Sequence, residues 1–566
     1  MYEEIIERLN PKPKFNLTWY HDKDLYSEGE IEDTIIHLIS ENDPEDYVQA
    51  IADNYSWSAY YHLSHVRKNI LNWYPFDPEA SVLEIGCGMG AITGMLCDRC
   101  KEVTAVELSK RRATGALLRC REKDNLEIIV GNLNEISFEK KFDYITLIGV
   151  LEYQGSYTAT ENPYLDFLKK VKSLLKPEGK LLIAIENQYG LKYWCGARED
   201  HTGIPFEGMN QYSISQKQVR TFSKASLEEL VRAGGFQNVY FYYPMPDYKL
   251  PTVVYSQDCL PSNGNLLNTQ YYYVPDAATL VAQEEKIYGD LIRNGVFEFF
   301  ANSFLVECTG EGRVGEITFA SLSCKRFPEY QIGTRFRGKT AVEKFPLFHP
   351  LGEGHVQEIL ENERALQERG LCVWKSRLLE QSLETAYLEA PTLEDILLEA
   401  SRRKDVEKIC EIWDLIYKEI LQSSEEVSWE ENLMYTLALG VERDREKYGP
   451  ILRMGYPDMI LRNAFWKDGR IWWFDQEWKL EHIPAKFILY RAILQFYCSY
   501  EEASKALPLK EIAYRMGVAM LWKEFGQLDE LFNSVIIDPV LIAEINGFKG
   551  NSREEALKNI KRLMKQ

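Results

Sequence analysis

The sequence lacks the features of several protein classes. No run of 18 apolar residues occurs in its 566 residues, so no segment has the composition of a membrane-spanning helix. No long block of lysine and arginine interrupts a formal net charge of -20, and so acidic a chain repels phosphate backbones. The composition therefore argues against a transmembrane protein and against nucleic acid as a partner or substrate.

Two further absences concern the cellular compartment. The 11 cysteines are scattered without a repeating framework, as suits a reducing environment. The first residues, MYEEIIERLN, are acidic and lack the basic segment and apolar core of a signal peptide. We therefore expect a cytoplasmic protein.

What the sequence does contain is a glycine-rich turn in residues 82–94, which read VLEIGCGMGAITG. The apolar start predicts a buried strand, and the residues from Ala91 onward predict a helix. Between them, Gly86, Gly88 and Gly90 remove three side chains, so the backbone can lie against a ligand near a helix N-terminus.

The glycine spacing alone leaves two ligands open. Gly86, Gly88 and Ala91 also satisfy the fingerprint of a dinucleotide-binding turn. The tighter G-x-G-x-G spacing, Glu84 before the turn and Glu107 after the next strand favour S-adenosylmethionine (SAM) instead. In either case the Glu107 carboxylate is placed to accept hydrogen bonds from two ribose hydroxyls.

Three more strand-like segments follow at regular intervals, in residues 128–136, 141–153 and 174–187. With the glycine turn, this order resembles the class I SAM-dependent methyltransferases over residues 56–256. The resemblance implies an α/β fold with a Rossmann-like seven-stranded sheet, in which a hairpin at residues 238–256 supplies strands six and seven. It also implies the cofactor-binding residues, namely Glu84, Gly86, Gly88, Gly90, Glu107, Asn132, Leu133 and Gly149.

Two segments flank the predicted cofactor site. Residues 58–76 predict a helix that would bring His62 or Arg67 near the cofactor. Residues 187–212 form a polar connection longer than a strand-to-helix link requires, at a strand end where α/β folds place substrates. We expect the acceptor site there, with His201 or Asp200 as a general base; a solvated flap with buried anchors is the alternative.

The C-terminal half carries a second pattern. Asp458 and Asn463 are five residues apart and Asp475 follows after a strand-like segment, which is the spacing of a kinase catalytic loop and its metal-binding aspartate. Asp458 would orient the acceptor hydroxyl, while Asn463 and Asp475 would bind Mg²⁺. Upstream, Lys344 lies on a predicted strand, and the helix after it offers three ion-pair partners, Glu358, Glu361 and Glu363.

This order resembles a two-lobed α+β protein-kinase-like fold of the aminoglycoside and choline phosphotransferase type. The resemblance implies ATP binding through Lys344. The sequence departs from the pattern in three ways: no histidine precedes Asp458, Glu477 stands where DFG has glycine, and no G-x-G-x-x-G precedes Lys344. The domain is therefore either a phosphotransferase or a degenerate lobe that serves as a scaffold.

The two halves together resemble bifunctional enzymes that phosphorylate and methylate the terminal sugar of lipopolysaccharide O-antigen chains. The resemblance implies a glycan or other small-molecule acceptor, glycosyltransferase partners, and a place at the inner face of the membrane. The expected domains are a helical extension (1–55), a methyltransferase (56–256), a helical connector (257–300) and a kinase-like domain (301–566). A non-catalytic adaptor and an NAD-dependent oxidoreductase are the alternatives.

Overall fold

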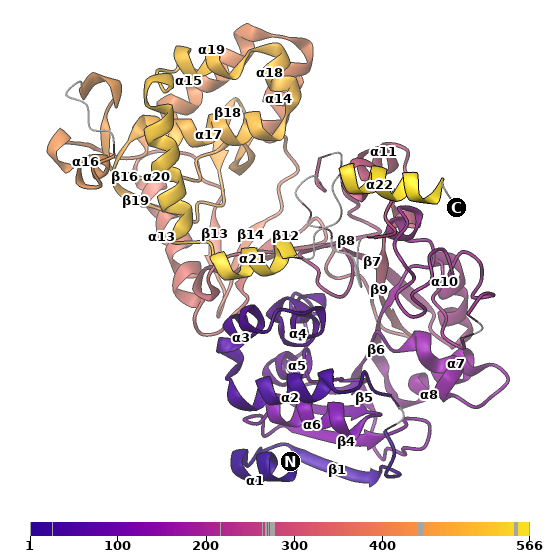
Figure 1. Ribbon diagram of the computed structural model, residues 1–566. Coiled ribbons are helices and arrows are strands. Elements are labelled where there is room, and N and C mark those ends of the chain that lie inside the picture. The colour runs from indigo at the N-terminus through magenta and orange to yellow at the C-terminus, as the bar shows by residue number, and fades with distance from the viewer. Residues whose placement is uncertain are drawn as a thin grey trace. The chain divides into compact units, whose positions relative to one another are not determined.

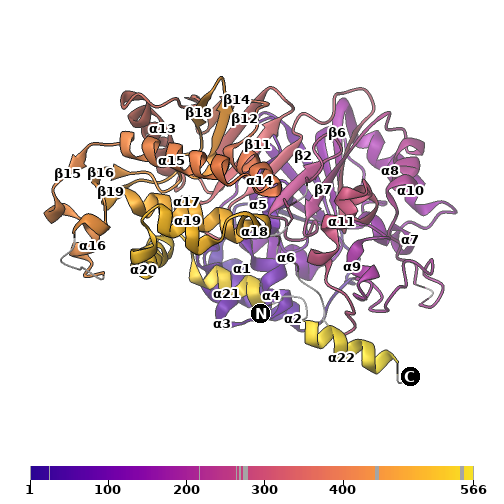
Figure 2. The ribbon, with the colours of Figure 1, turned by 90° about the horizontal axis from the view of Figure 1, so that it is seen from above.

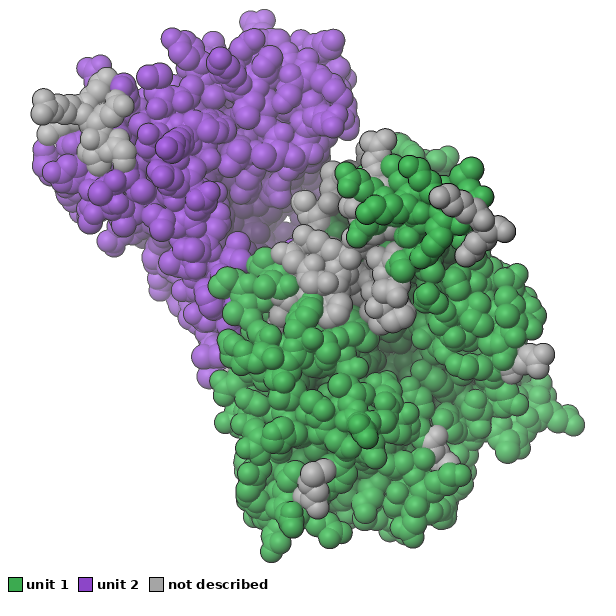
Figure 3. Space-filling model, viewed as in Figure 1, with its two compact units in different colours: residues 1–324, 539–566 green, residues 325–538 purple. Residues whose placement is uncertain are grey.

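The structure is a computed structural model that describes residues 2–24, 26–215, 217–262, 264–266, 269, 271, 278–439, 445–547 and 553–564. It divides the chain into two compact units, which Figure 3 shows in green and purple. Unit 1 comprises residues 1–324 and 539–566, and unit 2 comprises residues 325–538. Each unit has a large hydrophobic core of its own.

A parallel sheet forms the centre of unit 1. Its strands lie in the order β4, β3, β2, β5, β6, and each pairs in parallel with its neighbours. Most residues of these strands are buried because helices cover both faces of a parallel sheet; Leu181, Ile183 and Ile185 of β6 are fully buried. The bounds are β2 Ser81–Ile85, β3 Glu102–Glu107, β4 Leu126–Gly131, β5 Phe142–Ile148 and β6 Leu175–Glu186.

The sheet continues beyond β6 with an inserted strand. Strand β9 (Ser303–Thr309) lies antiparallel between β6 and β7 (Asn238–Met245), and β8 (Val253–Ser256) and β10 (Phe319–Leu322) follow β7 in the strand order. The predicted hairpin forms and β7 is strand six as expected, but the assignment of β8 as strand seven was wrong, because β9 takes that position between β6 and β7. The sheet thus runs past the predicted boundary at residue 256.

The N-terminal segment is part of unit 1 and is not purely helical. Strand β1 (Lys14–Trp19) pairs in parallel with β4 and forms the far edge of the sheet. Around it lie α1 (Tyr2–Leu9), α2 (Ile31–Glu41) and α3 (Tyr47–Asp53). The single helix expected at 58–76 is broken at Ser64, whose side chain caps the second piece; the pieces are α4 (Trp57–Leu63) and a 3-10 helix, His65–Ile70.

Helices pack on the sheet of unit 1, as Figure 1 shows. Those between the strands are α5 (Thr93–Arg99), α6 (Lys110–Arg119), α7 (Gln154–Tyr157), α8 (Pro163–Leu174), α9 (Leu191–Trp194) and α10 (Lys224–Ala233). Pro163 begins α8, where its fixed φ suits the first turn. Figure 2 shows α8 and α10 side by side near β6 and β7, which they contact.

The predicted connector and the C-terminus also belong to unit 1. Within 257–300 the described residues contain a 3-10 helix (Glu284–Lys286), α11 (Tyr288–Arg293) and α12 (Phe297–Phe300); residues 272–277 lie outside the described part. The last helices, α21 (Pro539–Gly547) and α22 (Arg553–Leu563), return to unit 1, where α21 contacts α3 and Asn559 Nδ2 donates to the Leu280 carbonyl.

Unit 2 begins with an antiparallel sheet in the order β11, β12, β14, β13, followed along the chain by a mostly helical part. Its span, 325–538, is shorter at both ends than the predicted 301–566. The sheet strands are β11 Ile332–Arg337, β12 Ala341–Pro346, β13 Ser376–Leu378 and β14 Leu383–Ala386, with α13 Glu353–Glu368 after β12.

The helical part of unit 2 is built around α15 (Val406–Gln422) and α17 (Ala485–Ser499), whose buried faces form its core. The smaller helices are α14 Leu393–Arg403, α16 Leu433–Thr436, α18 Glu501–Ala506, α19 Leu509–Arg515 and α20 Trp522–Ser534. The strands are β15 Glu426–Val427, β16 Ile451–Gly455, β17 Ala464–Lys467, β18 Arg470–Trp473 and β19 Leu480–Pro484. None of the helices that the structure describes is both long and apolar enough to cross a bilayer.

Candidate functional site

A cavity of about 580 Å³ opens at the carboxyl ends of β2, β3, β5 and β6. This is where parallel α/β sheets bind ligands, because the strand-to-helix loops diverge there. The glycine turn after β2 forms one wall, and the loop after β6 contributes Asp200, His201 and Gly203 to another. The predicted cofactor and acceptor segments therefore meet in one cavity.

The three glycines of the turn have different surroundings. All have positive φ, between +55° and +77°, a conformation that side chains disfavour. A Cβ at Gly88 would enter open space, and Gly86 and Gly88 line the cavity. A Cβ at Gly90 would instead lie 3.0 Å from Ala116 Cα of α6, and Gly90 is not part of the lining, so its predicted cofactor contact is replaced by helix packing.

Two buried carboxylates frame the glycine turn. Glu107, at the end of β3, accepts hydrogen bonds from Gly88 N at 2.8 Å and Ser109 N at 3.0 Å. Glu84 accepts one from Thr93 Oγ1 at 2.6 Å, and burial raises the pKa of Glu84 to about 7. A carboxyl that is half ionised at neutral pH within an enclosed cavity suits a cationic ligand group.

The remaining predicted cofactor residues also border the cavity. Asn132, Leu133 and Gly149 line it, as do His62 and Arg67 from the two helical pieces before β2. Asn132 Nδ2 donates to the Tyr157 carbonyl at 3.1 Å, which fixes the amide in place. The donor set, the glycines that leave space and the buried Glu107 fit SAM.

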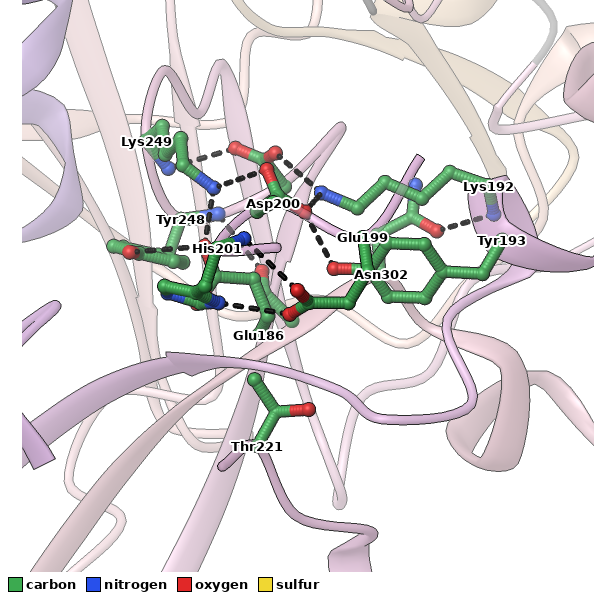
Figure 4. A network of polar contacts seen from close by, with 12 residues as sticks. Glu186, Lys192, Tyr193, Glu199, Asp200, His201, Thr221, Tyr248, Lys249 and Asn302 are labelled. Atoms are coloured by element: carbon green, nitrogen blue, oxygen red, sulfur yellow. Dashed lines mark hydrogen bonds and ion pairs between the residues drawn. The ribbon is translucent and has the colours of Figure 1, made fainter. Parts of the chain in front are cut away.

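His201, which lines the cavity, lies among three glutamates, two of which, Glu186 and Glu199, Figure 4 shows beside it. Its Nδ1 is 2.8 Å from Glu199 Oε1, and its Nε2 faces Glu152 Oε1 at 3.7 Å and Glu186 Oε2 at 3.9 Å. Burial would lower the pKa of His201, but the carboxylates of Glu186, Glu152 and Glu199 raise it well above its usual value. Without a bound cation beside it, the imidazole therefore favours its protonated form, which argues against its predicted role as a base.

Asp200 is held in a network with two lysines. Lys192 Nζ lies 2.8 Å from Asp200 Oδ2 and Lys249 Nζ lies 3.0 Å from Oδ1, as Figure 4 shows. Burial alone would raise the pKa of Asp200, but the two lysines lower it well below its usual value. A carboxylate held so firmly in its ionised form is a poor proton acceptor, so Asp200 positions the lysines.

Two residues that the sequence did not single out dominate this part of the cavity. Glu152 and Glu186 are each 1% exposed, and neither Glu152 Oε2 nor Glu186 Oε2 has a hydrogen-bond partner among the described residues. Glu186 Oε1 accepts from Tyr248 Oη at 3.2 Å and contacts Lys249. Glu186 ends β6 and Glu152 follows β5 closely, and an acidic residue at such strand ends was the available signal.

Unit 2 brings its predicted residues into a second polar cluster. Lys344 of β12 contacts Asp475 and lies 2.7 Å from Glu477 Oε1, and Arg326 contacts Glu477 Oε2. The expected helix partners differ: Glu358 and Glu361 pair with Lys479, and Glu363 accepts hydrogen bonds from Ser376. Glu477, which stands where the DFG pattern has glycine, therefore pairs with both Lys344 and Arg326.

The loop residues of unit 2 lie around the same cluster. Asn463 Nδ2 donates to the carbonyls of Asp458 at 3.2 Å and Asp475 at 3.3 Å, and Glu477 N donates to Asp458 Oδ2 at 3.2 Å. Burial, with the charges of Glu477 and Asp475, raises the pKa of Asp458 to about 7. The structure therefore brings the predicted catalytic and metal-binding residues together; Asp475 Oδ1 is already engaged by Lys344.

The family match lies within unit 1. Residues 83–183 match a family described as a methyltransferase domain. A malonyl-[acyl-carrier protein] O-methyltransferase of Priestia megaterium is 32% identical over 22% of this chain and 42% of its own length. Nodulation protein S of Sinorhizobium fredii is 26% identical over 21% of this chain and 52% of its own length.

A solved structure, the N-methyltransferase NodS from Bradyrhizobium japonicum, is similar over 45% of this chain and 97% of its own, with 14% identity and a TM-score of 0.24. The chain spans about half the length of these two curated relatives. Residues 83–183 run from β2 to β6 and include the glycine turn, Glu107 and Glu152. By the family match, residues 83–183 therefore form part of a SAM-dependent methyltransferase domain of class I.

Proposed function

We propose that unit 1 transfers a methyl group from SAM to a hydroxyl of a small-molecule acceptor, and that this acceptor is the terminus of a bacterial surface glycan. The proposal rests on one cavity with three buried carboxylates in its lining. The Glu107 carboxylate can accept hydrogen bonds from the ribose hydroxyls of the cofactor, and Glu152 and Glu186 are available to the methyl acceptor. Aromatic side chains of the same lining, among them Trp57, Tyr153 and Tyr248, offer faces on which a sugar can stack.

The residues of the chain supply position and proton transfer. Bound SAM supplies an electrophilic methyl group. Burial, and the charge of Glu186, raise the pKa of Glu152, so this carboxylate is a better proton acceptor than an ordinary glutamate. A hydroxyl bound beside Glu152 can pass its proton to Oε2 as the oxygen attacks. The carboxylates disfavour an anionic phosphate, so the cavity supports the hydroxyl over the phosphate as acceptor.

The cofactor part of the proposal is tested by calorimetry with S-adenosylhomocysteine. Binding to the purified chain supports it; binding of NAD in place of S-adenosylhomocysteine would establish the oxidoreductase alternative. The inserted antiparallel β9 already argues against that alternative, since a doubly wound dinucleotide sheet is mostly parallel. The acceptor part is tested by mass spectrometry of surface glycans from cells that lack the protein, where an unchanged methylation pattern would overturn it.

For unit 2 we propose an aminoglycoside or choline phosphotransferase type of fold that binds Mg-ATP and phosphorylates the same glycan. The clustering of Lys344, Asp458, Asn463 and Asp475 supports phosphoryl transfer. The engagement of Lys344 and Arg326 by Glu477 supports the alternative, a scaffold for glycosyltransferases at the inner face of the membrane. A thermal-shift titration with Mg-ATP separates them, because a scaffold lobe shows no stabilisation.

A further inference from the structure

The part of the cavity around His201 holds more negative than positive charge. In the network around His201, five carboxylates face two lysines: Glu152, Glu186, Glu199, Asp200 and Asp247 against Lys192 and Lys249. The lysines contact Asp200, Asp247 and Glu186 Oε1, which leaves Glu152 and Glu186 Oε2 facing the imidazole. Buried charges are costly unless they are paired or bind a metal ion.

The side chains that remain form a set of metal ligands. One ligand atom from each of Glu152, Glu186 and His201 lies within 4.8 Å of the others. Glu186 Oε2 is buried, has no hydrogen-bond partner among the described residues, and faces His201 Nε2. An unpartnered buried oxygen beside an imidazole nitrogen is a second indication of a missing ligand, independent of the acidic cluster.

The surroundings of the imidazole match those of a metal-binding histidine. Such a histidine usually gives its second ring nitrogen to a carboxylate, which fixes the tautomer. Here Glu199 Oε1 lies 2.8 Å from His201 Nδ1, and Glu199 is itself anchored by the backbone N–H groups of His201 at 3.0 Å and Thr202 at 2.8 Å. This arrangement directs Nε2 toward Glu152 and Glu186.

We propose that Glu152, Glu186 and His201 bind one divalent transition-metal ion, of the Mn²⁺ or Zn²⁺ type, at the acceptor end of the cavity. An imidazole with two carboxylates suits these ions, whereas Mg²⁺ prefers oxygen ligands alone. The role of the ion rests on the proposed function: it would hold the acceptor oxygen and lower the pKa of its hydroxyl. Glu152 Oε2 remains to accept the proton when the methyl group leaves sulfur for oxygen.

The test is a titration of chelator-treated, full-length protein with MnCl₂, in which electron paramagnetic resonance measures free Mn²⁺. We expect Mn²⁺ to bind with an affinity that falls at least about tenfold in Glu152→Gln and in His201→Gln, which each remove a ligand. In Glu199→Gln, which removes only the hydrogen-bond partner of the imidazole, the affinity should fall by about 10- to 100-fold. The matched control is His62→Gln, since His62 is a buried histidine of the same cavity beside a single carboxylate, Glu28, at 3.9 Å.

The site would be overturned by absence of Mn²⁺ and Zn²⁺ binding, by an affinity unchanged in Glu152→Gln and His201→Gln, or by a preference for Mg²⁺ over both ions. A loss of Mn²⁺ affinity in His62→Gln as large as that in His201→Gln would overturn it as well. S-adenosylhomocysteine is titrated into the same samples. Its binding shows that each variant is folded, and its failure in the unmodified protein, with Mn²⁺ still bound, would overturn the proposed methyl transfer and leave the metal site standing.

Discussion

Each unit of the molecule contains a buried cluster of carboxylates and cations, and the two clusters are balanced differently. In unit 2, Lys344 and Arg326 both contact Glu477, so the pKa of Glu477 falls well below its usual value although burial opposes this. In unit 1, the pKa of Glu152 is raised because it is buried beside Glu186. The comparison teaches that Glu477 has two cations of its own unit as counter-charges, whereas Glu152 faces the imidazole of His201, which it shares with Glu186 and Glu199.

The largest expected effect is the loss of the cofactor without Glu107. Glu107→Ala removes a buried acceptor for the ribose hydroxyls, and two hydrogen bonds to a charged group contribute about 1.5–3 kcal/mol each, so affinity for S-adenosylhomocysteine should fall more than about 100-fold. Calorimetry measures it. Glu107→Gln, which keeps one carbonyl acceptor, should lose less, and an unchanged affinity in Glu107→Ala would contradict the cofactor assignment.

The second-largest expected effect is on protein stability, measured with a chelator present and without nucleotide. It tests the charge balance of the two clusters directly. Glu477→Gln leaves Lys344 and Arg326 without their shared carboxylate, and breaking a buried pair costs about 3–5 kcal/mol, so unit 2 should unfold at lower temperature or denaturant. Glu152→Gln removes an excess negative charge, so unit 1 should be as stable or more stable.

Both variants are measured by denaturant unfolding at pH 7.5. A raised folded-state pKa means that ionised Glu152 lowers stability above the usual glutamate pKa, and a lowered one means that ionised Glu477 adds stability there. Destabilisation of equal size in both variants would break the comparison. Glu358→Gln is the control in unit 2, since Glu358 pairs with Lys479, 34% exposed, and should change stability little.

A smaller effect should appear in the pH dependence of cofactor binding. The pKa of Glu84 is raised to about 7 by burial, so its ionised fraction rises from about a tenth at pH 6 to about nine tenths at pH 8. If the ammonium of the cofactor's methionine part binds beside Glu84, affinity should rise up to about ninefold over this range. Calorimetry at both pH values measures the change. Glu84→Gln should abolish it, and an unaltered pH profile in that variant would show that another group is responsible.

The smallest expected effect is a difference between Gly88 and Gly90, two glycines of the same turn, in what a substitution by alanine changes. Gly90→Ala places a Cβ 3.0 Å from Ala116 Cα at a φ of +77°, so unit 1 should lose about 1–3 kcal/mol of stability with little change in cofactor affinity. Gly88→Ala meets open space in the cavity and carries only the strain of a φ of +55°, so it should lose less stability than Gly90→Ala and more cofactor affinity. Thermal unfolding and calorimetry of both variants test this, and a reversed pattern would contradict the cavity geometry.

The parts of unit 1 that the sequence predicts are those coded locally. The glycine turn and the parallel strands follow from short apolar runs and glycines, and they form as expected. Strand β9 could not be found in this way, because its position is set by pairing with β6 and β7, more than 50 residues away in the chain. A turn-rich segment near residue 260 therefore looked like the end of the domain.

The candidate site shows the same limit. Its position was predictable from strand ends and a long polar loop, and His201 was found because histidines often act as bases. Its protonation was not predictable, since it depends on Glu152 and Glu186, which only folding brings near. In unit 2, the spacing of Asp458, Asn463 and Asp475 predicted a cluster that the structure assembles, while the kinase-like fold itself stays a prediction.

The return of α21 and α22 to unit 1 has a practical consequence for experiments. Unit 2 enters after residue 324 and leaves before residue 539, so it is an insertion, and a single cut cannot separate the two units intact. A protein truncated at residue 324 would lose the helix that contacts α3 and the partner of the Leu280 carbonyl. Unit 1 is better isolated by joining residue 324 to residue 539 through a flexible linker, which keeps both ends of its chain.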